Sequence, residues 1–161
     1  AVVMHGIRAK SRDNARTPFP WDGSDQGGFT TGTPWLAAHP RRAEVNAALA
    51  LADPQSVFHH YRQLIALRRQ HAVWVHGRTA LLWPDHPQLA AYVRVLGVQR
   101  LRVLCNLSGQ PVTFDLGTEA VLADAQLLLA NQPDAPARVD GGSGPITLQA
   151  WEARIDLGRA G

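Results

Sequence analysis

The sequence predicts a chain of mixed α and β structure, in which a loop-rich first part and one long helix precede a small antiparallel β-region. Three observations support this fold class. Glycine and proline are dense between residues 11 and 52, which argues against long regular elements there. Apolar residues then recur at helical spacing between residues 54 and 70. After His71 the apolar residues form short strand-like runs separated by turn residues.

The first part of the chain is predicted to consist of a helix end and a long loop. Val3, Met4 and Ile7 mark the expected end of a helix within the first ten residues. From Ser11 to about Ala52 we expect turns, and loops of such length tend to be functional or packed on something larger. Four aromatic side chains in this loop support that interpretation: Phe19, Trp21, Phe29 and Trp35.

One helix is predicted from about Pro54 to Gln70. Asp53 is a good N-cap residue, and proline suits the first helical position. Arg68 and Arg69 fall near the predicted end, where positive charge suits the helix dipole. The apolar stripe of this helix consists of Val57, Phe58, Tyr61, Leu64 and Ile65.

Short strands are predicted in the remainder of the chain. Their close spacing, with turn signals between them, is typical of an antiparallel sandwich or meander. We place the boundary near Ala72, which gives one domain over residues 1–72 and another over residues 73–161. The predicted strands cover residues 73–75, 79–83, 90–96, 101–107, 112–116, 121–122, 125–130, 146–148 and 151–157.

Composition bounds the class of protein. The chain has 161 residues, of which 45% are hydrophobic, so a packed core is expected in one domain or in two incomplete pieces. It contains no apolar run of about 18 residues, so we expect no membrane span, and its first residues do not have the pattern of a signal peptide. Cys105, the single cysteine, favours a reducing compartment and hence the cytoplasm, and its apolar neighbours predict a small core residue.

Charge and ligand patterns argue against two other classes of protein. The net charge is +3, but the arginines are scattered along the chain, so no nucleic-acid partner is expected. The stretch 22–27 resembles a calcium loop without the alternating acids or the glutamate at the twelfth position. His59, His60 and His86 have no partner at the spacing of metal ligands. The glycines around Ser143 do not match a nucleophile elbow, so this stretch is predicted to be a hairpin turn. We therefore expect neither a metal nor a cofactor.

Two segments resemble glycoside hydrolase family 13, in the branch of oligo-1,6-glucosidases, trehalose-6-phosphate hydrolases, sucrose isomerases and other α-glucosidases. The first segment is Lys-Ser-Arg-Asp-Asn-Ala-Arg-Thr-Pro-Phe-Pro-Trp-Asp at 10–22, continued by Gly-Gly-Phe-Thr-Thr-Gly at 27–32 and Pro-Trp at 34–35. The family usually has Met-Gln where this chain has Phe19 and Pro20. The second segment covers 53–58 and 61–68, and the likeness extends into the β-region as far as Trp-Glu-Ala at 151–153.

The resemblance implies that the chain is the C-terminal portion of an α-glucosidase. Residues 1–72 would be the tail of a (β/α)₈ barrel, with a substrate loop and the last helix, and residues 73–161 a small antiparallel β-sandwich domain. The partners would be an α-linked oligosaccharide or disaccharide and the remainder of the barrel. The catalytic carboxylates of the family lie on earlier strands, and no Asn-His-Asp motif occurs here. No catalytic residue is therefore expected in this chain, and the chain alone is expected to be inactive.

The resemblance also implies a substrate-binding role for Arg16, which matches the family arginine that reaches the glucose subsite. The competing interpretation is an arginine that pins its loop by bonding backbone carbonyls. Arg12 is a second candidate, although a structural ion pair with Asp13 is favoured over contact with sugar, and Asp13 and Asn14 are expected to build the turn. Trp21 and Trp35 either stack on sugar rings or fasten the loop to the barrel.

Two non-catalytic functions stay open at this point. One is a carbohydrate-binding or structural β-module, and the other is a relative of the family that has lost catalysis and serves as a scaffold. The complete Arg-Asp-Asn-Ala-Arg-Thr-Pro motif that ends in Pro18 argues against both, since a scaffold has no use for a subsite arginine.

Overall fold

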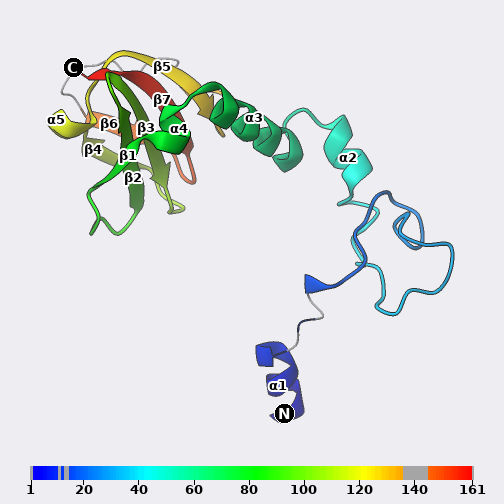
Figure 1. The fold of residues 1–161 in the computed structure, drawn as a ribbon. Coiled ribbons are helices and arrows are strands. Elements are labelled where there is room, and N and C mark those ends of the chain that lie inside the picture. Colours follow the sequence, from blue (N-terminus) through cyan, green and yellow to red (C-terminus); the bar gives the residue numbers. More distant parts are fainter. Residues whose placement is uncertain (1, 11, 13–14, 136–144, 161) are drawn as a thin grey trace. The chain divides into compact units, whose positions relative to one another are not determined.

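The computed structural model describes residues 2–10, 12, 15–135 and 145–160, and Figure 1 shows the elements that they form. The contacts divide the chain into two compact units, residues 1–62 and residues 63–161. Among the described helices, none is long and apolar enough to cross a membrane.

The first unit contains two short helices and the loop between them. Helix α1 (Val2–Lys10) confirms the expected helix at the start of the chain. Helix α2 (Ala47–Ala52) lies where only turns were expected. Its N-cap is Asn46, whose side-chain oxygen accepts a hydrogen bond from Leu49 N at 2.9 Å. That bond satisfies one of the free amide groups of the first helical turn.

Helix α3 (Val57–Gln70) confirms the predicted helix but begins one turn later than expected. The prediction of Asp53 as its N-cap is wrong, because Asp53 is the C-cap of α2 and its carboxylate accepts from Gln55 N at 2.9 Å. Ser56 precedes the helix instead, and its hydroxyl accepts a long bond of 3.5 Å from His59 N. No residue of α3 is buried, and its apolar stripe is exposed at Val57, Phe58, Tyr61 and Ile65.

The second unit is built on two antiparallel sheets, as the periodicity after His71 predicts. The larger sheet has the strand order β1-β2-β3-β7-β5, and the smaller one pairs β4 with β6. Every strand is antiparallel to its neighbours. The strands are β1 (Arg78–Leu82), β2 (Leu89–Leu96), β3 (Gln99–Asn106), β4 (Val112–Asp115), β5 (Leu122–Ala130), β6 (Pro145–Leu148) and β7 (Ala153–Ala160).

Three predicted elements of this unit need correction. The strand expected at 73–75 is the helix α4 (Val73–His76). The two strands expected at 121–122 and 125–130 are one strand, β5, which continues through a bulge with Asp124 in the left-handed region (φ 53°). A short helix α5 (Gly117–Ala120), which the sequence analysis did not single out, connects β4 to β5.

The core of the second unit lies on both faces of the larger sheet. One cluster joins Leu82, Val93 and Leu104 of that sheet to Val112 and Leu148 of the β4-β6 pair. The other cluster contains Leu101 and Val103 of β3, covered by Val73 of α4. Both faces of β3 are therefore buried, because successive side chains of a strand point to opposite faces. Cys105 packs beside the second cluster, as expected, and burial raises the pKa of its thiol.

A buried ionic group replaces apolar packing on one patch of the first face. Asp156 of β7 accepts hydrogen bonds from Arg102 of β3 and from Arg154, and all three side chains are only 1% exposed. Arg102 also donates to the Ala120 carbonyl at 2.9 Å. Burial lowers the pKa of the Arg102 guanidinium, and the charge of Asp156 opposes this effect. Sequence pattern alone does not reveal the group, because charged residues in a strand usually face water.

Candidate functional site

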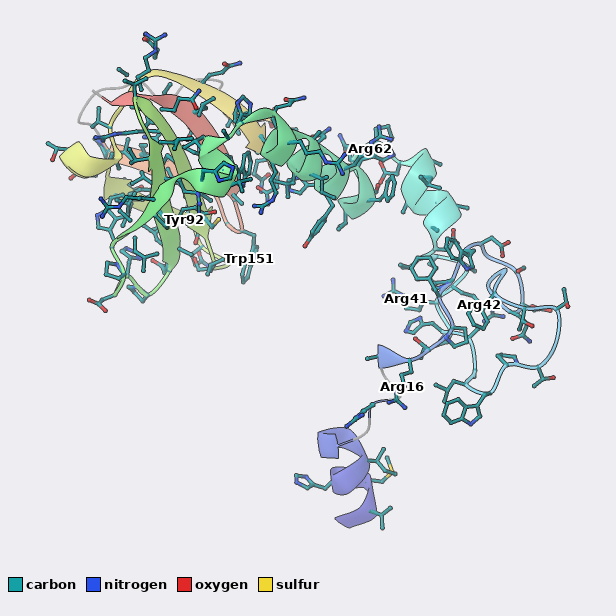
Figure 2. All side chains as sticks on the ribbon, viewed as in Figure 1. Arg16, Arg41, Arg42, Arg62, Tyr92 and Trp151 are labelled. Atoms are coloured by element: carbon teal, nitrogen blue, oxygen red, sulfur yellow. The ribbon has the colours of Figure 1, made fainter. Side chains whose placement is uncertain are left out.

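The two arginines of the family motif lie between α1 and the loop that follows it, where Figure 2 labels Arg16. Ala15 N donates to the Arg12 carbonyl at 3.1 Å, which closes a turn immediately before Arg16. Both arginine side chains are exposed, and neither guanidinium group has a hydrogen bond or an ion pair in the described part of the chain. Among these residues, Arg16 therefore makes no bond to a backbone carbonyl of the kind that the competing interpretation requires. The roles expected of Asp13 and Asn14 fall on residues outside the described ranges.

The loop after Arg16 is held in a fixed shape by its own hydrogen bonds. Trp21 N and Asp22 N both donate to the Gly27 carbonyl, at 2.7 and 3.3 Å. The Asp22 carboxylate accepts from Ser24 N at 2.9 Å and from the Ser24 hydroxyl at 2.5 Å. These two bonds lower the pKa of Asp22, since they stabilise its charged form. Gly28 has a positive φ of 65°, and a Cβ there would lie 2.7 Å from the Asp22 carboxylate.

The segment before α2 closes this loop from the other side. Arg42 donates from Nε to the Ser24 carbonyl at 2.8 Å and lies 3.6 Å from the Asp25 carboxylate. Asn46, which is 7% exposed, donates to the Arg42 carbonyl at 2.7 Å. Ala47 N donates to the Pro20 carbonyl at 2.9 Å. Residues 20–28 and 42–48 thus form one hydrogen-bonded structure.

The aromatic side chains of the loop stand largely in the open. Trp35 is 85% exposed and Trp21 57% exposed. The Trp21 ring makes an edge contact with the Phe19 ring, with centroids 4.8 Å apart. Both uses considered for the tryptophans, sugar stacking and attachment to a larger body, need such unoccupied faces.

Two glutamates of the described chain make structural contacts. Glu44 pairs with Arg41 at 2.9 Å on the surface. Glu152 falls within the strand predicted over 151–157, but it lies in the turn before β7, where it is 3% exposed and accepts a hydrogen bond from Gln149 N at 2.7 Å. Among the described residues there is also no group of three or more acidic, histidine or cysteine side chains that fits a metal ion.

Ser24, Arg42 and Asn46 are the residues of this loop that sequence reasoning missed. The bond from Arg42 to Ser24 joins residues 18 positions apart, so no local pattern predicts it. Asn46 could have been found, because asparagine directly before an Ala-Leu run is a typical N-cap signal.

Comparison with known proteins gives a consistent result along almost the whole chain. Residues 2–77 match the family model for the catalytic domain of α-amylase. The oligo-1,6-glucosidase of Halalkalibacterium halodurans is 44% identical over 158 residues, which cover 98% of this chain and 28% of that protein. The trehalose-6-phosphate hydrolase of Bacillus subtilis is 40% identical over 128 residues, which cover 78% of this chain and 23% of that protein.

Solved structures agree with these relatives. The crystal structure of Bacillus licheniformis trehalose-6-phosphate hydrolase superposes with a TM-score of 0.86 at 33% identity, over 98% of this chain and 28% of that one. This chain therefore spans about a quarter of the length of the proteins that it matches. The chain belongs to the α-amylase family, glycoside hydrolase family 13, in the branch that contains oligo-1,6-glucosidases and trehalose-6-phosphate hydrolases.

Proposed function

We propose that this chain is the C-terminal part of a retaining α-glucosidase that acts on α-linked oligosaccharides or disaccharides. The observation that carries the proposal is the 44% identity to an oligo-1,6-glucosidase over 98% of the chain. In this proposal residues 1–72 are the end of a (β/α)₈ barrel, and residues 73–161 are a β-sandwich domain. The match of residues 2–77 to a catalytic-domain model supports a boundary close to that position.

Arg16 is the residue through which this part of the enzyme would touch substrate. A guanidinium group is planar and permanently charged, so it can donate to two sugar hydroxyls at once or to a hydroxyl and a carboxylate. Among the described residues no acceptor takes up the donors of the exposed Arg16, and its neighbouring loop is fixed by the bonds of Asp22 and Arg42. Arg12, which is also exposed, is the second candidate.

The bond-breaking groups would come from the rest of the protein. A retaining glycosidase needs a carboxylate nucleophile and a second carboxyl group as acid and base, about 5–5.5 Å apart. Glu44 and Glu152 are both committed to other contacts in this chain. We propose the cytoplasm as the compartment, which the single half-buried Cys105 supports.

The test compares Arg16→Ala with Arg41→Ala in the full gene product. Both arginines are exposed, but Arg41 bonds a neighbouring surface glutamate, so its removal controls for loss of one positive charge. Hydrolysis of p-nitrophenyl α-D-glucoside and isomaltose gives kcat/KM for each variant. Loss of a charge-assisted hydrogen bond predicts a fall of about 10–100-fold for Arg16→Ala. Arg41→Ala should stay within about twofold.

Two results would count against the proposal. An unchanged kcat/KM in Arg16→Ala, with the variant folded by circular dichroism, would remove Arg16 from the site. Turnover of the chromogenic glucoside by the purified 161-residue chain would show that the chain does contain catalytic groups.

A further inference from the structure

An open depression of about 630 Å³ lies in the second unit, between the end of α3 and α4. Its polar side chains are those of Arg68, Arg69, Gln70 and His76, and no acidic residue lines it. Its basic side chains come from two helices: Arg68 and Arg69 from α3, and His76 from α4. An anion in the depression would therefore meet them from two directions.

The sequence on both sides of these residues is likewise rich in basic side chains and free of acidic ones. Between residues 54 and 84 the chain has four arginines and four histidines and no aspartate or glutamate. The whole chain has 16 basic and 13 acidic residues, so this segment holds +4 and the remainder of the chain −1. The part of this segment that lines the depression, residues 65–76, contains two of the arginines and no acidic residue.

The arginines of the depression have no acceptor among the residues that the structure describes. Within those residues neither Arg68 nor Arg69 makes a hydrogen bond or an ion pair, and both are exposed. The backbone acceptors nearby are already used: Arg94 donates to the carbonyls of Val73 and Gly77, at 3.2 and 2.7 Å. The Ala72 carbonyl accepts from His76 N at 2.9 Å. The helix dipole favours positive charge at the C-terminal end of α3, and this effect explains why Arg68 and Arg69 stand there. It does not account for His76, which α4 adds to the same depression.

We propose that this depression binds a phosphate dianion, either as free phosphate or as the phosphate group of a sugar monophosphate. Two neighbouring guanidinium groups match the oxygens of a phosphate by bidentate, charge-assisted hydrogen bonds. The amide of Gln70 supplies an uncharged donor. The ligand relieves the repulsion between adjacent unpaired cations, which is the physical source of its affinity. This inference does not rest on the proposed glucosidase function, since it uses only residues of the second unit.

The test titrates inorganic phosphate into the full gene product, by calorimetry and by ³¹P NMR, at constant ionic strength. The variant is Arg68→Gln/Arg69→Gln. The matched control is Arg62→Gln/Arg78→Gln, which removes the same charge from exposed arginines of the same acid-free segment outside the depression. We expect the first variant to bind phosphate at least tenfold more weakly and the control to change less than threefold. Arg68→Lys/Arg69→Lys keeps the charge and should recover part of the loss.

A second arm distinguishes the two sources of the phosphate group. Glucose 6-phosphate that binds as tightly as inorganic phosphate shows that the phosphate group alone is recognised, and tighter binding shows that the sugar contributes as well. Either result supports the proposal if Arg68→Gln/Arg69→Gln weakens it. The proposal is overturned if phosphate does not saturate the chain below about 10 mM, or if both double variants lose affinity equally. Circular dichroism on each variant establishes that a loss of binding is not a loss of fold.

Discussion

Replacing Asp156 by asparagine should destabilise the second unit severely, because it removes the carboxylate that two buried guanidinium groups share. Arg102 donates to Asp156 Oδ2 from Nε at 3.3 Å and from Nη2 at 3.1 Å. Arg154 donates to Oδ2 at 3.2 Å and to Oδ1 at 2.8 Å. In Asp156→Asn, the charge is lost and an NH₂ donor replaces one of these acceptor oxygens. The Ala120 carbonyl, at 2.9 Å, is then the strongest acceptor left to Arg102.

The expected loss of unfolding free energy follows from the burial of Arg102, Arg154 and Asp156. All three side chains are 1% exposed, so solvent cannot compensate the lost partner. Removing one member of a buried ion pair costs about 3–5 kcal/mol. Asparagine keeps one acceptor oxygen, so we expect about 3 kcal/mol. For a unit the size of residues 63–161, that corresponds to a fall in Tm of at least about 12 °C.

Urea unfolding monitored by circular dichroism measures this loss. Glu44→Gln is the control, since it disrupts a carboxylate–arginine pair of 2.9 Å whose side chains are 65% and 67% exposed. It should change the free energy of unfolding by less than about 0.5 kcal/mol. Converting the whole group to apolar residues in Arg102→Met/Arg154→Met/Asp156→Leu should recover most of the stability, since no buried charge then lacks a partner. A loss below about 1 kcal/mol in Asp156→Asn would refute the reasoning.

Three further outcomes are expected. Asn46→Ala removes the N-cap of α2 and the bond to the Arg42 carbonyl, so the free energy of unfolding should fall by about 1–2 kcal/mol, measured by urea unfolding against Ala43→Ser as a surface control. Ser24→Ala should return the pKa of Asp22 towards its ordinary 3.8, measured by NMR titration of the carboxyl carbon. Because the folded pKa of Asp22 is the lower one, its contribution to stability is present above the unfolded pKa and is lost as the pH falls through the folded pKa; Ser24→Ala should remove that acid dependence. Burial raises the pKa of Cys105, so its reaction with a disulfide reagent at pH 8 should be much slower in the folded chain than in denaturant; equal rates would contradict the burial.

Local pattern determined much of the secondary structure of this chain. The helical spacing from Val57 onward produces α3, and the alternating runs after Gly77 produce strands, of which β1, β2, β3, β4 and β6 have bounds within two residues of those predicted. The motif that contains Arg12 and Arg16 was sufficient to indicate the family, because many positions agree in order. Such signals lie within a few consecutive residues, where the chain's own periodicity and chemistry decide the outcome.

Elements whose conformation depends on distant residues could not be predicted. Val73–His76 has the composition of a strand, yet it is a helix whose carbonyls are bonded by Arg94, 21 residues away from Val73. The family resemblance identified Arg16, but only the folded loop shows that its side chain is exposed while Arg42 holds the neighbouring segment. The domain boundary near Ala72 and the role of Arg16 stay predictions.

The sequence by itself determined the helix and strand periods, the antiparallel character of the second unit and the family of the chain. The tertiary structure alone decided that Arg102, Arg154 and Asp156 are buried together, and that Arg68, Arg69 and His76 line one depression. The physical reason is that burial and electrostatic pairing depend on which distant side chains meet. A one-dimensional pattern does not contain that information.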